Sequence, residues 1–189
     1  GGDQVFSRTA GAPLVRGNAV RLLRDAAENY PAWLCAIGTA RSSVHFENYI
    51  IRDDTTGRRF YEALAERARA GVAVRVLTDW LGSRGLGRRL AAELRAAGVE
   101  FRRFNPPRVL DLLGNAARDH RKLVVTDAGT AIVGGLCIGD EWAGDPAHGI
   151  QPWRDTAIQM DGPAAMALDR GVCVVASGAR IEPFACGVN

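Results

Sequence analysis

The chain has 189 residues, of which 47% are hydrophobic and 24% charged, and its formal net charge is +3. These values suit one folded domain with a sizeable core and exclude a chain that is disordered over most of its length. They also exclude a strongly basic chain of the kind that coats nucleic acid. The modest excess of arginine still suits an anionic partner such as a phosphate, a phospholipid or a polynucleotide.

The first half of the chain alternates between helix-like and strand-like patterns. Residues 18–40 are expected to be mainly helical, with a kink or a new first turn at Pro31. Residues 43–51 are rich in β-branched and aromatic side chains and predict a strand. A helix followed by a strand is then predicted twice, over 57–70 with 72–78 and over 86–97 with 99–104. Strands that alternate with helices through short links indicate βαβ units, so an α/β fold with a mixed, mostly parallel sheet is predicted.

The second half is expected to complete the sheet within the same compact domain. Residues 121–126 and 130–138 predict two strands joined by a hairpin turn, 153–160 predict a last strand, and 163–169 open a helix. The apolar segment 108–113 has two interpretations. It is either a helix packed on the core or a lip that touches acyl chains at a membrane surface.

The cysteines and the hydrophobic runs bear on where the protein works. The four cysteines lie at wide, irregular spacings without a zinc-binding pattern and indicate reduced thiols. No run approaches the length of a membrane-spanning helix, and the first residues lack the order of a signal peptide. We therefore expect a protein of the cytoplasm or of the cytoplasmic face of a membrane. The start at Gly1 rather than at Met suggests a fragment of a longer chain.

A histidine and a lysine two residues apart carry the predicted chemistry. His120 and Lys122 lie on an expected strand, so both side chains leave the same face. The ammonium can hold a phosphodiester while the neutral imidazole, whose unperturbed pKa is about 6.5, attacks phosphorus. A covalent phosphohistidine divides one difficult displacement into two easier ones. Because lysine can neutralise the phosphoryl oxygens, no metal ion or other cofactor is expected.

The residues around this pair carry a family resemblance. From Asp119 the chain reads D-H-R-K-L-V-V-T-D-A-G-T-A-I-V-G-G-L-C, which resembles the motif H-x-K-x4-D-x6-G-[GS]-x-N of the phospholipase D superfamily. The stretches H-F-E-N-Y-I-I-R-D-D, F-N-P-P and W-R-D-T-A-I-Q-M-D-G-P-A are similar to the first half of bacterial cardiolipin synthases. The resemblance runs from about Gly11 to about Leu168. It implies an α/β/α sandwich and a two-step transfer through phosphohistidine.

The resemblance assigns roles to four residues. His120 would be the nucleophile, and Lys122 would bind phosphate. Asp155 would orient His120 by a hydrogen bond to its second ring nitrogen. Asp127 ends the motif and is grouped with the catalytic residues. We expect it to be mainly structural, because it lies at a turn and faces away from His120 by strand parity.

Four further residues belong to the predicted substrate site. Gly134 and Gly135 match the glycines that let the backbone approach the phosphate closely. Glu47 matches the glutamate of the family segment I-E-x-Y-I and either faces the cleft or serves as a buried structural carboxylate. Cys137 stands where the family usually has Asn, so a contact to phosphate would be lost or reduced. It is either an inert small residue, a subfamily adaptation or a reactive thiol.

The chain contains one motif, whereas phospholipase D sites pair two, with one histidine as nucleophile and the other as acid. Either two copies pair as a homodimer, or the chain is the front half of a longer protein, as in a cardiolipin synthase-like chain. Residues 1–170 are expected to form the catalytic half-domain, and 171–189 an atypical tail that is truncated or aberrant. Trp142 and Trp153 lie near the expected mouth, either in the core or at a lipid interface.

We therefore predict a phosphatidyltransferase or phospholipase D, closest to the cardiolipin synthases, that acts on anionic phospholipid headgroups at a membrane surface. The first alternative is a phospholipase D-family nuclease that acts as a homodimer. A nucleic-acid partner is disfavoured because the sequence has no evident strip of basic and aromatic residues for stacking bases. The second alternative is a non-catalytic half-domain that serves as a binding module.

Overall fold

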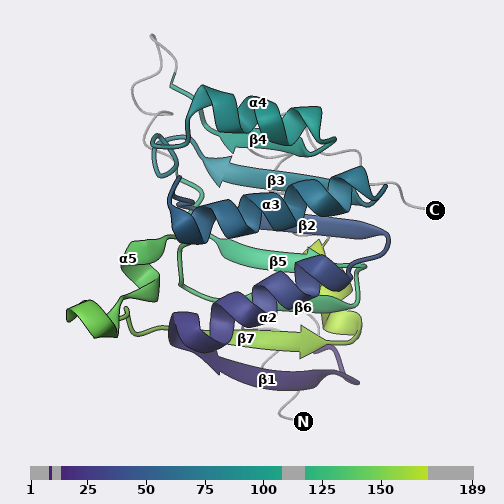
Figure 1. Ribbon diagram of the computed structural model, residues 1–189. Helices are drawn as coiled ribbons and strands as arrows, with labels where there is room; N and C mark the ends of the chain where they lie inside the picture. Colours follow the sequence, from purple (N-terminus) through teal and green to yellow (C-terminus); the bar gives the residue numbers. More distant parts are fainter. Residues whose placement is uncertain (1–8, 10–13, 108–117, 170–189) are drawn as a thin grey trace.

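The computed structural model describes residue 9 and residues 14–107 and 118–169 of the chain. These residues form a seven-stranded sheet in the order β1-β7-β6-β5-β2-β3-β4 (Figure 1). The strands are β1 (Ala19–Arg24), β2 (Ser43–Asn48), β3 (Ala73–Asp79), β4 (Glu100–Phe104), β5 (Lys122–Thr126), β6 (Thr130–Val133) and β7 (Thr156–Asp161). The helices are α2 (Asp25–Thr39), α3 (Thr55–Arg69), α4 (Arg88–Ala96) and α5 (Asp140–Ala143), with the 3-10 turn η2 (Pro146–His148) and a helical segment over 163–169.

The sheet is mixed, as predicted, but the prediction that it is mostly parallel is wrong. Among the described strands, β2, β3 and β4 run parallel, and the other four neighbouring pairs are antiparallel. Parallel neighbours need a long crossover, which α3 and α4 supply, whereas a short turn joins β5 to β6. Asp127 and Ala128 in that turn have positive φ angles of 52° and 50°, which reverse the chain tightly.

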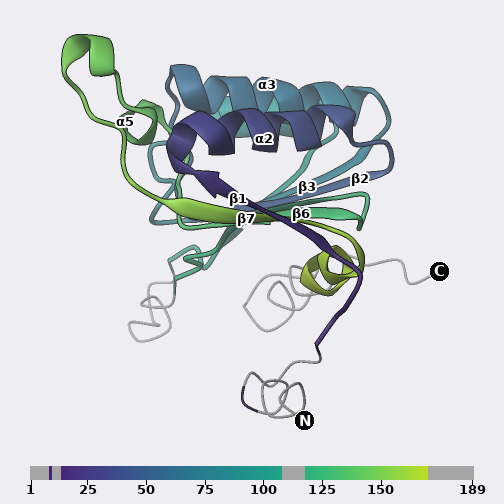
Figure 2. The ribbon, with the colours of Figure 1, turned by 90° about the horizontal axis from the view of Figure 1, so that it is seen from below.

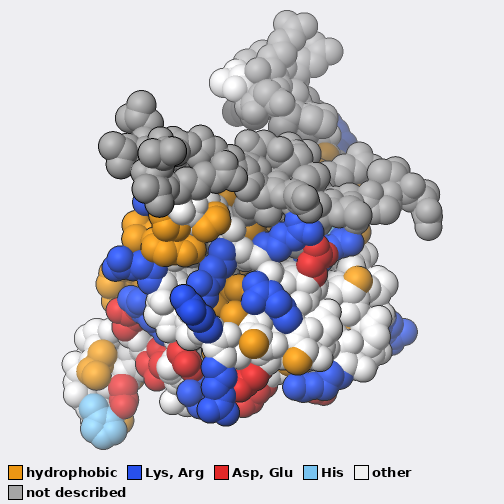
Figure 3. Space-filling model, turned by 90° about the horizontal axis from the view of Figure 1, so that it is seen from above, with side chains coloured by type: hydrophobic (Ala, Val, Ile, Leu, Met, Phe, Trp, Pro, Cys, Tyr) orange, Lys and Arg blue, Asp and Glu red, His pale blue; other side chains and the backbone are white. Residues whose placement is uncertain are grey.

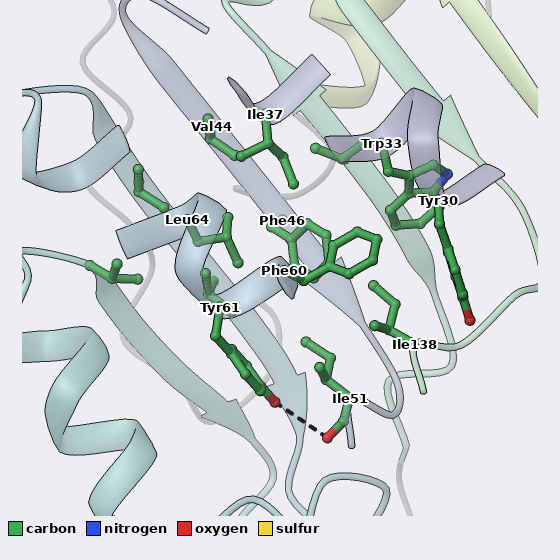
Figure 4. Packing of buried hydrophobic residues seen from close by; sticks show 14 of the residues in the cluster. Tyr30, Trp33, Ile37, Val44, Phe46, Ile51, Phe60, Tyr61, Leu64 and Ile138 are labelled. Carbon is green, nitrogen blue, oxygen red and sulfur yellow. Dashed lines mark hydrogen bonds between the residues drawn. The ribbon is translucent and has the colours of Figure 1, made fainter. Parts of the chain in front are cut away.

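Helices α2 and α3 lie side by side on one face of the sheet (Figure 2). The first turn of α3 is closed by Asp54, whose carboxylate accepts a hydrogen bond of 2.8 Å from the Gly57 N–H. Between the two helices and the sheet, Phe46 of β2 packs against Trp33 of α2 at 5.8 Å and against Phe60 of α3 at 6.1 Å between ring centroids (Figure 4). This aromatic core fixes both helices on the strands that lead to the site.

The opposite face carries a smaller apolar cluster. Leu123 and Val125 of β5, Ala131 of β6 and Ala165 of the segment 163–169 form it. Figure 2 shows this helical segment on the side of the sheet away from α2 and α3. Helices thus lie on both faces, and the expected α/β/α architecture is confirmed.

Two local predictions are wrong. Residues 19–24 form the edge strand β1, because they pair along their whole length with β7, and α2 begins only at Asp25 and runs through Pro31. The strand predicted over 130–138 ends at Val133. The apolar segment 108–113 and the tail 171–189 lie outside the described residues. No helix in the described ranges combines the length and the apolar character needed to cross a bilayer.

Candidate active site

The predicted site residues other than Asp127 gather at one end of the sheet, which we call the site end. It holds the carboxyl ends of β2, β3, β4 and β6 and the first residues of β5 and β7. Parallel strands linked by helices place their carboxyl ends and the helix amino ends at one edge, where open α/β sheets bind ligands. His120, Lys122, Gly135 and Asp155 all lie within two residues of these strand ends.

Tyr49, the residue after β2, contacts both members of the predicted pair. Its ring centroid lies 4.7 Å from that of the His120 imidazole, with the two planes tilted by 56°. The Lys122 ammonium lies 5.2 Å from the centroid of the Tyr49 ring and donates a hydrogen bond of 2.8 Å to the His120 carbonyl. His120 is exposed, whereas Lys122 is only 3% exposed. The ring therefore holds an accessible imidazole beside a buried ammonium.

Lys122 is the only lysine of the chain, which also contains 23 arginines. Burial lowers the pKa of its ammonium, and the charges of Cys137, Asp119 and Asp155 oppose part of that shift. A buried ammonium is unfavourable for folding, since it loses its hydration. A compact cation with three rotatable donors suits the spread of charge over phosphoryl oxygens.

Two glycines allow β7 to approach the end of β6. A Cβ added to Gly134 would lie 2.6 Å from the Ala157 Cβ, and one added to Gly135 would lie 2.5 Å from Asp155 Oδ2. The Gly135 N–H donates a hydrogen bond of 3.1 Å to Asp155 Oδ1. Among the described residues, no hydrogen bond joins Asp155 to His120, so the orienting role of Asp155 stays a prediction.

Cys137 lies inside the core rather than at an open surface. It is 6% exposed, and its carbonyl accepts a hydrogen bond of 2.8 Å from the Tyr30 hydroxyl. Burial raises the pKa of the thiol, although the nearby Lys122 ammonium opposes this shift. A thiol that stays protonated and packed favours the interpretation of Cys137 as an inert small residue.

Asp127 lies at the far end of β5 from His120. Its carboxylate accepts hydrogen bonds of 2.8–2.9 Å from the N–H groups of Arg41, Ser42 and Ser43 and from the Ser42 hydroxyl. Desolvation acts to raise the pKa of Asp127, but these hydrogen bonds outweigh it and lower the pKa to about 2. The side chain ties the β5–β6 turn to the loop before β2, which favours a structural role.

Glu47 is fully buried and is bound by Arg121, whose Nε and Nη2 donate hydrogen bonds of 2.6–2.9 Å to its carboxylate. It is in register with Leu123 of the smaller cluster, so it points away from the face of Lys122. Burial and the neighbouring Asp119 raise the pKa of Glu47 to about 8, against the opposing charge of Arg121. This arrangement favours the buried structural carboxylate. Within the described ranges, no three His, Cys, Asp or Glu side chains are grouped so as to hold a metal ion.

The prediction from sequence missed Tyr49, Arg121 and Asp79. Asp79, at the end of β3, accepts hydrogen bonds of 2.8 and 2.9 Å from the N–H groups of Leu81 and Gly82 and one of 3.0 Å from that of Asp119. It thereby fixes the beginning of the motif segment to the loop after β3. The signal available for Asp79 was an acidic residue at the end of a predicted strand. The signal available for Arg121 was a charged residue between the two motif positions.

The two tryptophans near the site end differ in exposure. Trp142 is 7% exposed and belongs to the core, whereas Trp153 is 60% exposed. Their rings meet edge to face at 6.2 Å. Of the two alternatives left open by the sequence, the core applies to Trp142, and Trp153 presents its indole to the surroundings.

Comparison with protein families shows to which family the chain belongs. A model of the family described as cardiolipin synthase, PLD-like domain, matches residues 33–140, which is more than half of the chain. The chain belongs to the phospholipase D-like family. The match includes the motif segment from His120 through Cys137, while Asp155 lies beyond it.

Relatives of this phospholipase D-like chain are longer than the chain itself. The major cardiolipin synthase of Bacillus subtilis is 38% identical over 159 residues, which cover 83% of the chain and 33% of that protein. Cardiolipin synthase A of Pseudomonas fluorescens is 39% identical over 157 residues, which cover 82% of the chain and 33% of that protein. The chain thus spans about a third of the length of the curated relatives it matches.

Solved structures share the phospholipase D-like fold at low sequence identity. Nuc of Salmonella typhimurium, a phospholipase D family member, superposes with a TM-score of 0.62 at 18% identity, over 89% of the chain and 100% of Nuc. The phosphatidylserine synthase of Haemophilus influenzae gives a TM-score of 0.63 at 15% identity, over 81% of the chain and 35% of that protein. These likenesses support the fold alone.

Proposed function

We propose that the chain is one catalytic half of a phosphatidyltransferase or phosphodiesterase that acts on phospholipid headgroups, closest in chemistry to the cardiolipin synthases. The observation that carries the proposal is the exposed imidazole of His120 beside the buried ammonium of Lys122, with the ring of Tyr49 against both. The match to cardiolipin synthases at 38% and 39% identity supports the substrate class.

The proposed reaction has two displacements at phosphorus. In the first, a ring nitrogen of His120 bonds to phosphorus while the bond from phosphorus to the leaving alcohol breaks, and phosphohistidine forms. Lys122 neutralises charge on the non-bridging oxygens, and Asp155 keeps the imidazole in one tautomer. A second histidine protonates the leaving alcohol. In the second displacement an alcohol or water attacks the phosphohistidine and releases His120.

The second histidine has to come from outside this segment. The chain contains one H-x-K motif and spans about a third of its relatives' length. We therefore propose that a second half supplies the acid, either from the rest of a longer protein or from a second copy of this chain. The reaction takes place at the cytoplasmic face of a membrane, where phospholipid headgroups are accessible.

Native mass and activity, measured together, test this proposal. Wild type and His120→Ala are assayed on phosphatidylglycerol and on a generic soluble phosphodiester, without added metal. A dimer whose activity disappears in His120→Ala supports a site built from two copies, and an inactive monomer assigns the activity to a longer protein. Turnover that survives in His120→Ala contradicts the proposed mechanism.

A further inference from the structure

The positive charge of the chain is concentrated in one segment. Residues 55–104, from α3 through β4, contain 11 arginines and five acidic residues, which gives this segment a net charge of +6. Since the whole chain carries +3, the remaining residues together carry −3. Figure 3 shows the α4 side of the molecule, where Lys and Arg side chains outnumber Asp and Glu. The small net charge of the chain therefore conceals a basic side.

Three of these arginines lie at the site end. Arg59 is the fifth residue of α3, Arg88 opens α4, and Arg84 lies in the loop between β3 and α4. The neighbouring Ser83 hydroxyl donates a hydrogen bond of 3.1 Å to the Tyr49 carbonyl, so this loop borders the candidate site. All three arginines are exposed, and none pairs with an acidic side chain in the described part of the chain. We call Arg59, Arg84 and Arg88 the rim arginines.

Acidic side chains at the same end are engaged within the fold. Asp54 and Asp140 accept hydrogen bonds of 2.8 Å from backbone N–H groups in the first turn of α3, and Asp79 accepts them from the loop after β3. Glu141 pairs with Arg52 at 2.8 Å. These carboxylates are thus bound by other partners than the rim arginines, and the amino ends of α3 and α4 add partial positive charge.

We infer that the site end rests on an anionic lipid surface, with the rim arginines over the headgroups and Trp153 at the interface. Guanidinium groups bind phosphate oxygens in a bidentate manner, and an exposed indole favours the boundary between headgroups and acyl chains. Trp153 lies two residues before Asp155, so both features flank the candidate site. The inference rests on the proposed phospholipid substrate and adds the face of the domain that meets the membrane.

Vesicle binding tests this orientation without any turnover. The test variant changes all three rim arginines to Gln, and the matched control changes Arg21, Arg41 and Arg69 to Gln. The control residues are also exposed, in the middle of β1, before β2 and at the end of α3, away from the site end. Both variants lose three charges. Arg88 lies in the first turn of α4, where removal of a cation relieves its conflict with the helix dipole. Arg59 and Arg84 are exposed, so the test variant should keep its fold.

The wild type should sediment with phosphatidylcholine vesicles that contain phosphatidylglycerol, less at high salt, and not with phosphatidylcholine alone. Each basic residue near an anionic bilayer contributes about fivefold to partitioning, so the rim variant should bind roughly 100-fold more weakly. The control should remain near wild type. Equal losses in the two variants, wild-type binding that ignores phosphatidylglycerol, or tighter binding to duplex DNA than to vesicles would overturn the inference. Rim-dependent vesicle binding together with phosphodiesterase turnover that survives in His120→Ala would count against the proposed function alone.

Discussion

Asp127 should stabilise the fold without entering the reaction, and substitutions can separate the two roles. Its carboxylate collects four donors from the loop before β2, in a turn where its own φ is 52°. Asn tolerates positive φ and keeps one acceptor oxygen, so Asp127→Asn removes chiefly the charge. Asp127→Ala removes every acceptor and leaves a residue that disfavours the left-handed region.

The lowered pKa sets the size of the effect. A shift from 3.8 to about 2 would correspond to ~2.5 kcal/mol without screening, and exposure to solvent reduces it to about 1 kcal/mol. Asp127→Asn should therefore lower the free energy of unfolding by about 1 kcal/mol at pH 7, and Asp127→Ala by about 2 kcal/mol. For a domain of this size, these losses lower the melting temperature by roughly 2–4 °C and 4–8 °C.

Thermal unfolding, followed by circular dichroism between pH 2 and pH 7, measures the structural role of Asp127. Turnover at pH 7 measures its role in the reaction. Because the folded pKa of Asp127 is depressed, its stabilisation is present above the unfolded pKa near 3.8 and is lost as the pH falls through about 2. The gap between wild type and Asp127→Asn should close over that window, with turnover at pH 7 unchanged. If Asp127→Asn unfolds at the same temperature as the wild type but loses turnover by roughly 100-fold or more, the structural role is refuted and Asp127 is catalytic.

Three further substitutions have opposite signatures in activity and stability. Gly135→Ala should displace the Asp155 carboxylate and lower turnover by roughly 100-fold. The control Gly38→Ala, which has open space at its Cβ, should only stabilise α2. Equal turnover in the two variants would count against a functional need for the close approach of Gly135 to Asp155. Lys122→Met should abolish turnover and raise the melting temperature, because it removes a buried ammonium. A lower melting temperature would contradict the claim that the buried ammonium destabilises the fold. Tyr49→Phe keeps the ring and should leave kcat within about twofold of wild type, whereas Tyr49→Leu should lower kcat about tenfold. Equal kcat values in the two variants would exclude a positioning role for the ring.

Local periodicity predicted the part of the fold whose connections are local. The two helix–strand units between Gly57 and Phe104 have apolar spacing that leaves one stable arrangement, with crossover helices on one face. The direction of each strand in the second half depends instead on the length of its connection and on which strand of the sheet still has an unpaired edge. The strand β1 was missed because its six residues have a mixed composition and become a strand only by pairing with β7, more than 130 residues later.

The same distinction applies to the candidate site. His120 and Lys122 could be predicted because they lie two residues apart at the start of a predicted strand, although β5 begins only at Lys122 and His120 lies before it. The contacts of Tyr49 and the pairing of Arg121 with Glu47 could not, since they join segments more than 70 residues apart and depend on the antiparallel register of β2 with β5. A buried glutamate and a partly exposed arginine that meet only in the fold leave no local pattern in the sequence.

The nucleophilic role of His120 is open to a direct measurement. A p-nitrophenyl phosphodiester has a leaving group that departs without a proton, so one half of the site should react without the second histidine. The purified chain is mixed with this substrate, quenched at alkaline pH and digested for mass spectrometry. We expect a burst of nitrophenolate and a phosphoryl adduct on His120, both absent from His120→Ala. A burst of the same size in His120→Ala, or an adduct on another residue, would contradict the proposed reaction.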